Sequence, residues 1–344
     1  MKAASTIGGF FGLEPSGDPP AGDSVLARWT SAGGWSGFHN ARSAFAHLVR
    51  GLAPGTVWLP RYLCADMDAA AGSSVRRYGV DMALALDDAA FEAALAPGDL
   101  VAAVAYFGAP VCNRLREIAA RRADVVWLED RAQALDMGAG MPGAWRLYSP
   151  RKLLGVADGG LLVGPVSDLP APRLAPSPAS HAGAAEARAA AVTREQVEAA
   201  YRLYVDMERA HAVTDAALSD RTRDILAASP VEDMAARRRE NFAALDRRLS
   251  DRAAPVVARL RGTAAPFGYP LLLARERDAV AARLAADGLF CAVHWRELGE
   301  AGTTDPTDPV ASRLRDGMLT LPVDHRYGAA DMERLAGAVL RALS

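Results

Sequence analysis

The chain has 344 residues, which exceeds the usual size of one hydrophobic core, so we expect two lobes. Its 39 basic and 41 acidic residues are interspersed and give a net charge of −2, which argues against binding to nucleic acid or to an acidic membrane surface. No apolar run reaches the ~18 residues of a membrane-spanning helix. The first residues also lack the sustained apolar core of a secretory signal, so we expect a cytoplasmic protein.

The cysteine and histidine patterns exclude two further kinds of site. Cys64, Cys112 and Cys291 lie far apart and show no CxxC spacing, which supports neither a disulfide framework nor a zinc site. The six histidines are scattered and form no HExxH or comparable arrangement. We therefore expect no metal site.

The first segments predict an arm and an amphipathic helix. Residues 8–14, GGFFGLE, are expected to form an N-terminal arm that packs on the body of the protein or on a partner subunit. Apolar residues then recur at helical spacing between Ala44 and Val49. The residues from Asn40 to Ser43 include helix-capping types, and the start of a helix is a ready site for an anion.

Short apolar segments alternate with helical ones up to Gly164. This alternation predicts an α/β fold, with a mainly parallel central sheet that carries helices on both faces. The large domain is expected to span residues 1–195. Within it, residues 165–192 are rich in Pro, Ala and Ser, which is typical of a mobile linker. The expected strands are TVWL (56–59), VRRYGVD (75–81), DLVAAVAYF (99–107), VVWLED (125–130), AWRLYS (144–149) and LLVG (161–164).

The remaining chain, residues 196–344, predicts a helical connection and a smaller α+β domain. Helices are expected from residue 194 to 224 and from residue 231 to 249. A strand (266–274), a helix (278–289), a strand (290–295, FCAVHW), a further strand and a final helix follow. The triple arginine at 237–239 is read as a solvated helix face.

Lys152 is the residue that we expect to carry the chemistry. The sequence has only two lysines, Lys2 and Lys152, and 37 of its 39 basic residues are arginine. An arginine cannot lose its proton at ordinary pH, whereas a lysine amine can become neutral and nucleophilic, as Schiff-base chemistry requires. Lys152 follows one strand and precedes another that begins with Gly159 and Gly160. The alternative reading is an ordinary surface lysine.

The stretch around this lysine resembles the cofactor-binding core of fold type I pyridoxal phosphate (PLP) enzymes, and especially the nucleotide-sugar aminotransferases of the DegT/DnrJ group. In that family an acid followed by x-Ala-Gln, a serine, a lysine and a Gly-Gly strand hold the cofactor. The resemblance implies that Lys152 forms a Schiff base with PLP and that Asp130 pairs with the pyridinium nitrogen. It also implies that Gln133 lies near the ring hydroxyl and that Ser149 contacts the phosphate. The matching residues are Asp130, Ala132, Gln133, Ser149, Lys152, Gly159 and Gly160.

Asp130 has a physical role that fits this resemblance. It ends a buried strand, and ligands of open α/β sheets bind at that edge. A carboxylate beside a pyridine nitrogen favours the protonated ring, which is the better electron sink. The alternative for Asp130 is a helix N-cap. For Gln133 and Ser149 the alternatives are a solvated helix residue and a turn-forming residue.

Further binding residues are implied by position in the family pattern. Ala41, Arg42 and Ser43 occupy the place of a glycine-containing phosphate cradle, and the alternative is an ordinary helix cap. Either Tyr62 or Cys64 would cover one face of the cofactor ring. Tyr106 would border the substrate, although packing also explains its ring. His294, in the segment 290–295, is a weaker candidate at the edge of the cleft between the domains.

Two departures from the family pattern bear on the substrate. The serine-to-lysine spacing is three, as in fold type I enzymes generally, whereas the sugar aminotransferases commonly have five. The Asn-x-Arg-Met type segment that helps to bind nucleotide-sugar across the dimer is also not evident, and Ser219 and Arg221 lie about where it would be. The resemblance still implies a homodimer, because the family's sites draw residues from both subunits.

These observations favour a PLP-dependent aminotransferase that moves an amino group from an amino acid donor, with glutamate as the expected one, to a keto acceptor such as a keto-sugar nucleotide. Other PLP chemistry, as in a lyase or dehydratase, is one alternative. A second is a degenerate member that binds a ligand or partner without turnover. A nucleotide-binding protein unrelated to PLP is disfavoured because no GxGxxG or GxxxxGK[ST] motif occurs at a strand-to-helix turn.

Overall fold

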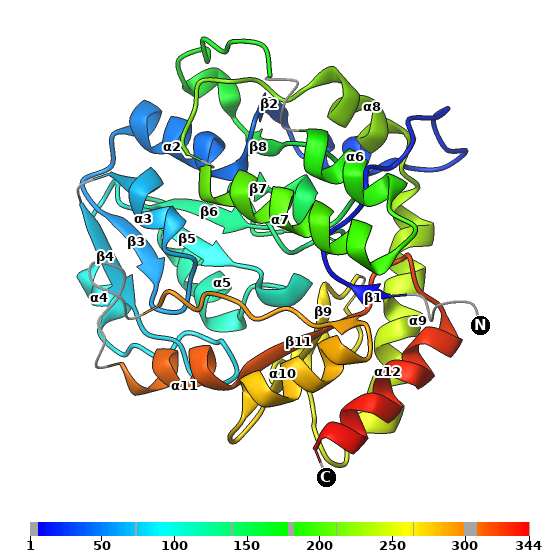
Figure 1. The fold of residues 1–344 in the computed structure, drawn as a ribbon. Coiled ribbons are helices and arrows are strands. Elements are labelled where there is room, and N and C mark those ends of the chain that lie inside the picture. Colours follow the sequence, from blue (N-terminus) through cyan, green and yellow to red (C-terminus); the bar gives the residue numbers. More distant parts are fainter. Residues whose placement is uncertain are drawn as a thin grey trace.

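The computed structural model describes residues 6–72, 74–138, 140–177, 182–210, 212–263, 265–298 and 308–343. Its largest feature is a seven-stranded sheet with the strand order β2-β8-β7-β6-β5-β3-β4 (Figure 1). Strand β8 is antiparallel to both of its neighbours, whereas the pairs from β7 to β4 are parallel. The strands are β2 (Gly34–Phe38), β3 (Val57–Pro60), β4 (Val75–Tyr78), β5 (Leu100–Val104), β6 (Val126–Asp130), β7 (Trp145–Tyr148) and β8 (Gly160–Gly164).

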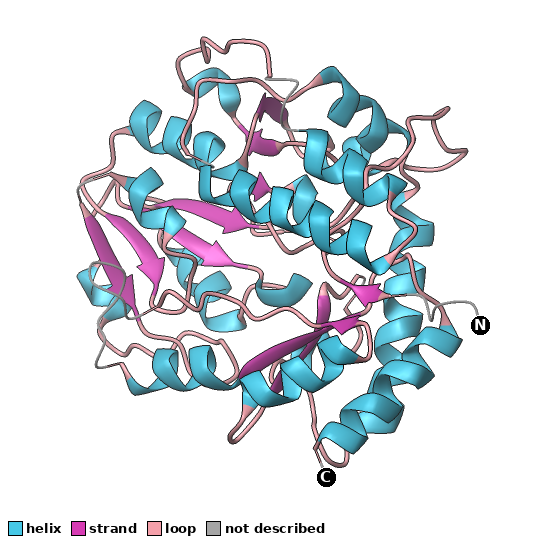
Figure 2. Ribbon diagram, in the orientation of Figure 1, coloured by secondary structure: helices cyan, strands magenta, loops and turns pink. Residues whose placement is uncertain are grey.

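Burial of the central strands explains why helices surround the sheet. All five residues of β5 are buried, as expected when both faces of a parallel strand are covered. Figure 2 shows helices around the sheet. The mainly parallel, helix-covered sheet predicted from the sequence is confirmed. The helices of this part are α1 (Val25–Thr30), α2 (Ala41–Leu52), α3 (Asp66–Ala71), α4 (Phe91–Ala94) and α5 (Asn113–Arg121).

The segment after β8 corrects two predictions. The range 165–192 contains a helix, α6 (Gly183–Ala190), besides irregular chain, and α6 lies beside α7 (Arg194–Ala210) (Figure 1). The helix predicted from 194 to 224 is wrong, because α7 ends at Ala210 and α8 (Asp220–Ala228) begins after a break. Ala216 and Ala217 in this break form bridges to Ala175 and Phe38, so pairing near the sheet edge replaces helix.

Residues 231–343, together with the N-terminal arm, form two short sheets and four helices in the described part. Strands β9 (Gly268–Leu272) and β11 (Met318–Pro322) are antiparallel, and β1 (Ile7–Gly8) pairs in parallel with β10 (Leu289–Phe290). The N-terminal arm therefore packs on the body of the protein, as one of the two readings of its sequence predicted. The helices are α9 (Val231–Leu249), α10 (Arg277–Ala286), α11 (Pro309–Gly317) and α12 (Ala329–Ala342).

The strand predicted over residues 290–295 is largely wrong. Only Leu289 and Phe290 form β10, and Trp295 has a φ of 52°, a left-handed conformation that no strand allows. The predicted strand over 99–107 also ends early, because Tyr106–Gly108 forms a 3-10 turn in which Phe107 has a φ of 55°. Among the described residues, no helix is long and apolar enough to cross a membrane.

Candidate active site

One pocket, of about 240 Å³, brings together most of the residues predicted for the site. They come from the start of α2, the segment after β3, the ends of β6 and β7, the turn after β7 and the segment after β10. Ligands of open α/β sheets bind at this carboxyl edge. The predicted residues that line the pocket are Ala41, Arg42, Cys64, Asp130, Gln133, Ser149, Lys152 and His294.

Lys152 owes its place to a tight turn at the end of β7. The turn Pro150–Lys152 begins at Ser149, whose carbonyl accepts a hydrogen bond from the Lys152 backbone N–H at 3.1 Å. The chain then reaches the two glycines of the motif. Gly159 has a φ of 128°, and a Cβ on Gly160 would lie 2.2 Å from the carbonyl carbon of Asn40. The Gly-Gly pair therefore lets β8 pass directly against the start of α2.

Asp130 is buried at the end of β6, with only 6% of its surface exposed. Its Oδ1 accepts a hydrogen bond from the Ala132 backbone N–H at 2.9 Å. Burial raises the pKa of this carboxyl group, although the charge of Lys152 and the Ala132 N–H act in the opposite direction. A positively charged group beside this buried carboxylate would strongly stabilise its ionised form.

Gln133 turns one end of its amide away from solvent. Its Oε1 accepts a hydrogen bond from the Phe107 backbone N–H at 2.9 Å. Because the oxygen is engaged, the amide nitrogen is the end suited to donate to an acceptor in the pocket. Gly108 permits this approach, since a Cβ there would lie 3.1 Å from the Gln133 carbonyl oxygen.

The end of the pocket where an anion could bind contains two arginines, Arg42 and Arg151. Arg42 contacts Asp66 Oδ2 at 2.7 Å and Glu208 Oε2 at 3.9 Å, and Arg151 pairs with the other oxygen of Glu208. Arg151, Asp66 and Glu208 line the pocket but are absent from the sequence prediction. The position of Arg151 beside Lys152 could have revealed it, whereas Glu208 is far away in sequence.

Ser43 does not line the pocket. Its backbone N–H donates to Asn40 Oδ1 at 2.8 Å, which is the helix cap, and its hydroxyl accepts from the Thr214 N–H at 2.9 Å. Asn40 also donates to the Ala212 carbonyl at 3.0 Å. The cap residues thus tie the α7–α8 connection to the start of α2.

Of the two candidates for the cofactor ring face, the pocket contains Cys64 and not Tyr62. Cys64 donates to Asp66 Oδ2 at 3.1 Å, and burial raises the pKa of this thiol to about 12. Tyr62 is fully buried and packs edge-on against Trp295, with 4.6 Å between ring centroids. Tyr106 lies outside the pocket as well, and its hydroxyl donates to the Tyr62 carbonyl. These tyrosines therefore support Trp295, a pocket residue that the sequence prediction left without a role.

His294 contributes a neutral imidazole to the pocket. Burial, together with the charge of Lys152, lowers the pKa of this side chain to about 3. Its Nε2 is buried and has no hydrogen-bond partner among the described residues. A ligand atom in the pocket would supply the missing partner.

Ser219 and Arg221 lie away from this pocket. Ser219 caps α8, and its hydroxyl donates to Asp158 Oδ1 at 3.1 Å. Arg221 pairs with Glu186 of α6. Their predicted contact with substrate across a dimer stays a prediction.

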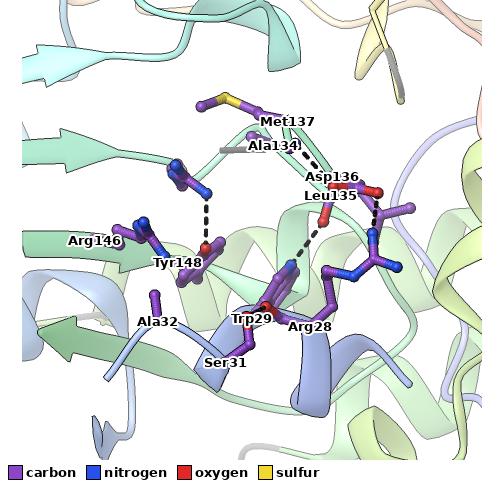
Figure 3. A pocket seen from close by; sticks show the side chains of 12 residues that line it. Arg28, Trp29, Ser31, Ala32, Ala134, Leu135, Asp136, Met137, Arg146 and Tyr148 are labelled. Atoms are coloured by element: carbon purple, nitrogen blue, oxygen red, sulfur yellow. Dashed lines mark hydrogen bonds and ion pairs between the residues drawn. The ribbon is translucent and has the colours of Figure 1, made fainter. Parts of the chain in front are cut away.

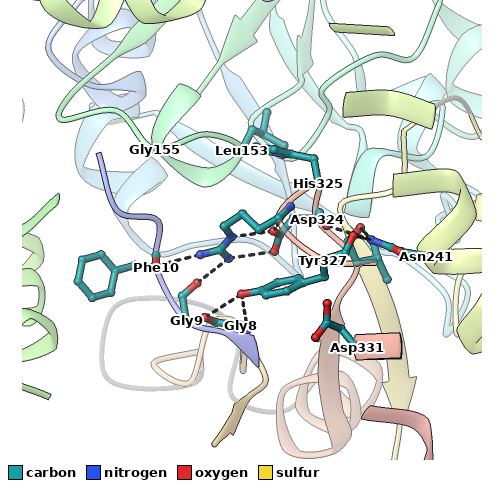
Figure 4. A network of polar contacts seen from close by, with 12 residues as sticks. Gly8, Gly9, Phe10, Leu153, Gly155, Asn241, Asp324, His325, Tyr327 and Asp331 are labelled. Atoms are coloured by element: carbon teal, nitrogen blue, oxygen red, sulfur yellow. Dashed lines mark hydrogen bonds and ion pairs between the residues drawn. The ribbon is translucent and has the colours of Figure 1, made fainter. Parts of the chain in front are cut away.

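The N-terminal arm contacts the chain around Tyr327, whose hydroxyl accepts a hydrogen bond from the Gly8 N–H at 2.7 Å (Figure 4), and it also contacts the chain that follows Lys152. Glu14 donates its backbone N–H to the Gly155 carbonyl at 2.7 Å, and its Oε1 accepts from the Gly155 N–H at 3.1 Å. The same oxygen lies 3.2 Å from His325 Nε2. The fully buried Arg238 of α9 donates to the Leu153 carbonyl at 2.8 Å. The arm and α9 thus both contact the chain that follows Lys152.

A second cavity lies on the opposite face of β6 and β7 (Figure 3). Arg131, Arg146 and Tyr148 line it, because alternate residues of a strand point to opposite faces. Arg131 donates to Glu129 Oε2 and to the Tyr148 hydroxyl, and Trp29 stacks on Tyr148 with 4.5 Å between ring centroids. No cluster of His, Cys, Asp or Glu in the described part of the chain could hold a metal ion.

Comparison with known proteins shows the fold. Neither a protein-family model nor a curated protein sequence matches this chain. Among solved structures, the sugar aminotransferase CalS13 from Micromonospora echinospora superposes with a TM-score of 0.66 and 23% identity, covering 94% of this chain and 93% of that one. A DegT DnrJ EryC1 StrS aminotransferase from Brucella abortus gives 0.61 and 18%, covering 92% and 87%. Spr1654 from Streptococcus pneumoniae in its PMP form gives 0.65 and 15%, covering 98% and 93%. The chain therefore has the fold of these aminotransferases, as its sequence predicted.

Proposed function

We propose that this protein is a PLP-dependent aminotransferase of the DegT/DnrJ type that acts on a keto-sugar. The observation that supports this most is the joint presence of Lys152 and the buried Asp130 in one pocket at the carboxyl edge of the sheet. The fold shared with sugar aminotransferases supports the substrate class.

The residues of the pocket fit PLP. Lys152 supplies the only lysine amine among the residues that line the pocket, Asp130 a buried carboxylate for a ring nitrogen, and Gln133 an amide nitrogen for a ring oxygen. Arg42, Arg151 and Ser149 offer donors for a phosphate at the other end. The unsatisfied Nε2 of His294 also calls for a polar ligand in this pocket.

Bound PLP would serve as the electron sink for a carbanion at the substrate carbon. Asp130 favours a protonated ring nitrogen, since its carboxylate is buried and gains from a positive partner. Lys152 Nζ would hold the cofactor and, once released from it, would carry a proton from the substrate carbon to the cofactor, which is the 1,3-transfer that transamination requires. Trp295 and Cys64 exclude water from the walls of the site, while the neutral His294 offers a hydrogen bond without adding charge.

The first test is the visible absorption spectrum of the protein with added PLP, before and after glutamate. We expect a band that depends on PLP and that glutamate bleaches, since half of a transamination converts PLP to its amine form. A keto-sugar nucleotide should then restore the band. A band unchanged by any amino donor would favour other PLP chemistry, and no band would favour a member that does not turn over substrate.

We also propose a homodimer. Tyr201 and Leu203 on α7 are 54% and 51% exposed, and the neighbouring Val192 is 85% exposed, which suits a surface that a second copy covers. Sedimentation of an active monomer would contradict this proposal.

A further inference from the structure

Glu208 occupies the part of the pocket where an anion would bind. It reaches in from the last turn of α7, and its two carboxylate oxygens face Arg42 and Arg151. The side chains of these three residues are 29%, 19% and 14% exposed, whereas that of Asp66, which also pairs with Arg42, is 46% exposed. A carboxylate that faces two guanidinium groups stands where a phosphate could pair with both of them.

The charges of the cluster cancel. Arg42 and Arg151 contribute two positive charges, while Glu208 and Asp66 contribute two negative ones. A phosphate dianion that entered this cluster would meet no net attraction from the four side chains. If one carboxylate leaves the arginines, these side chains carry a net positive charge that attracts a phosphate.

Local structure identifies Glu208 as the carboxylate that leaves. Asp66 lies in the first turn of α3, where a helix favours negative charge, and it also accepts a hydrogen bond from Cys64 at 3.1 Å. Glu208 lies in the last turn of α7, where the exposed carbonyl groups disfavour negative charge. α7 also buries few of its side chains, since Ala200 is the only buried residue among those that the structure describes in this helix.

We propose that Glu208 is an internal competitor for the phosphate subsite, and that the phosphate monoester of a ligand displaces it from Arg42 and Arg151. This inference rests on the proposed function in one respect, since it takes PLP as the ligand whose phosphate binds there. The exchange breaks two ion pairs to Glu208 and forms two to the phosphate, and no covalent bond changes. It releases the last turn of α7 when the subsite fills.

The test compares Glu208→Gln with the parent full-length chain. Affinities are measured for PLP and for pyridoxal by absorbance titration, and for inorganic phosphate by calorimetry. Removal of the competing charge should tighten the binding of PLP and of phosphate about tenfold while leaving pyridoxal unchanged. Glu198→Gln is the matched control, because Glu198 lies on the same helix and pairs with the exposed Arg194.

A weaker or unchanged affinity for phosphate in Glu208→Gln would overturn the proposal, since it would make Glu208 a support that holds the arginines in place. Glu208→Ala should give the same direction as Glu208→Gln, which guards against an effect of the amide. In the parent chain, phosphate should increase hydrogen exchange in the last turn of α7, and a decrease would contradict displacement. Tighter phosphate binding without any PLP binding would sustain this inference and reject the proposed function.

Discussion

The two faces of β6 and β7 differ in the partners that they give to a buried carboxylate. On the rear face, Glu129 accepts hydrogen bonds from Arg131 and from the Met141 backbone N–H, so the ion pair is well satisfied. On the front face, Asp130 is held by the Ala132 N–H, and its pKa is raised by burial. Glu129 and Asp130 are neighbours in one strand, but they have different surroundings. The rear carboxylate is paired with an arginine, whereas the front carboxylate faces the pocket, where we propose that it meets a ligand.

The largest expected effect is that of Lys152→Ala on the front face. Activity should fall by at least about 10³-fold, because the variant lacks both the nucleophile and the proton carrier. Borohydride reduction of the parent chain with PLP, followed by mass spectrometry, should place the adduct on Lys152. Lys2→Ala is the matched control, since it removes the only other lysine. An adduct of equal yield in Lys152→Ala would reject the assignment.

On the rear face, Glu129→Gln should mainly affect stability. Arg131 has a side chain only 5% exposed, and loss of its partner leaves a buried charge uncompensated. We expect the free energy of unfolding to fall by about 3 kcal/mol, as measured by urea denaturation. The exposed pair of Glu198 and Arg194 provides the comparison, and Glu198→Gln should change stability little. A loss of PLP affinity in folded Glu129→Gln would contradict the prediction that the rear face affects stability without affecting the front pocket.

Asp130→Asn should separate activity from stability. The rate should fall by about 10²-fold, because the ring nitrogen loses its anionic partner. Without cofactor the variant should be the more stable protein near neutral pH. Burial raises the folded pKa of Asp130 above its unfolded value, so the folded chain binds this proton more tightly. The stability contributed by Asp130 therefore falls as pH rises from the unfolded pKa through the folded one.

The difference in unfolding free energy between parent and Asp130→Asn, measured across that pH window, checks the sign. The advantage of the variant should grow with pH. If the advantage shrank as pH rose, the carboxylate would be stabilised in the folded chain, and the contrast between the faces would disappear.

The smallest effect is expected from Glu14→Gln in the arm. Burial opposes ionisation of Glu14, but the hydrogen bond and charge of His325 and the Gly155 N–H outweigh it, so the pKa of Glu14 is lowered. Its contribution to stability is therefore present above the unfolded pKa and lost as pH falls. The variant should lose about 1 kcal/mol near neutral pH, measured by thermal unfolding. A visible band for bound PLP that shifts in this variant would add the arm to the machinery of the front pocket.

Local sequence was enough to predict the core of the site. A continuous buried strand that ends in acid locates Asp130 at the end of β6, and the turn that follows the next strand locates Lys152, so both could be predicted within about twenty residues. The same local logic predicted the sheet. It left Tyr62 and Cys64 open for the ring face, and only the structure shows that Cys64 lines the pocket.

Contacts that are distant in sequence account for the failures. The path of the chain after β10 depends on Tyr62 and Tyr106 packing against Trp295, which no local pattern reveals. The break between α7 and α8 depends on pairing with Phe38 and Ala175. Glu208 enters the pocket only because the chain after α7 is tied to Asn40 and Ser43 at the start of α2.

Gly160 lets β8 lie directly against the start of α2, because it has no side chain. A Cβ at this position would lie 2.2 Å from the Asn40 carbonyl carbon and 2.4 Å from the Ala41 nitrogen. The strand after the lysine turn and the start of α2 are therefore in direct backbone contact. A single methyl group at this position would push β8 and the start of α2 apart. Arg42 at the start of α2 would then move away from Lys152, which lies in the turn before β8. The absence of a side chain at Gly160 therefore fixes how closely the strand after the lysine turn approaches the start of α2.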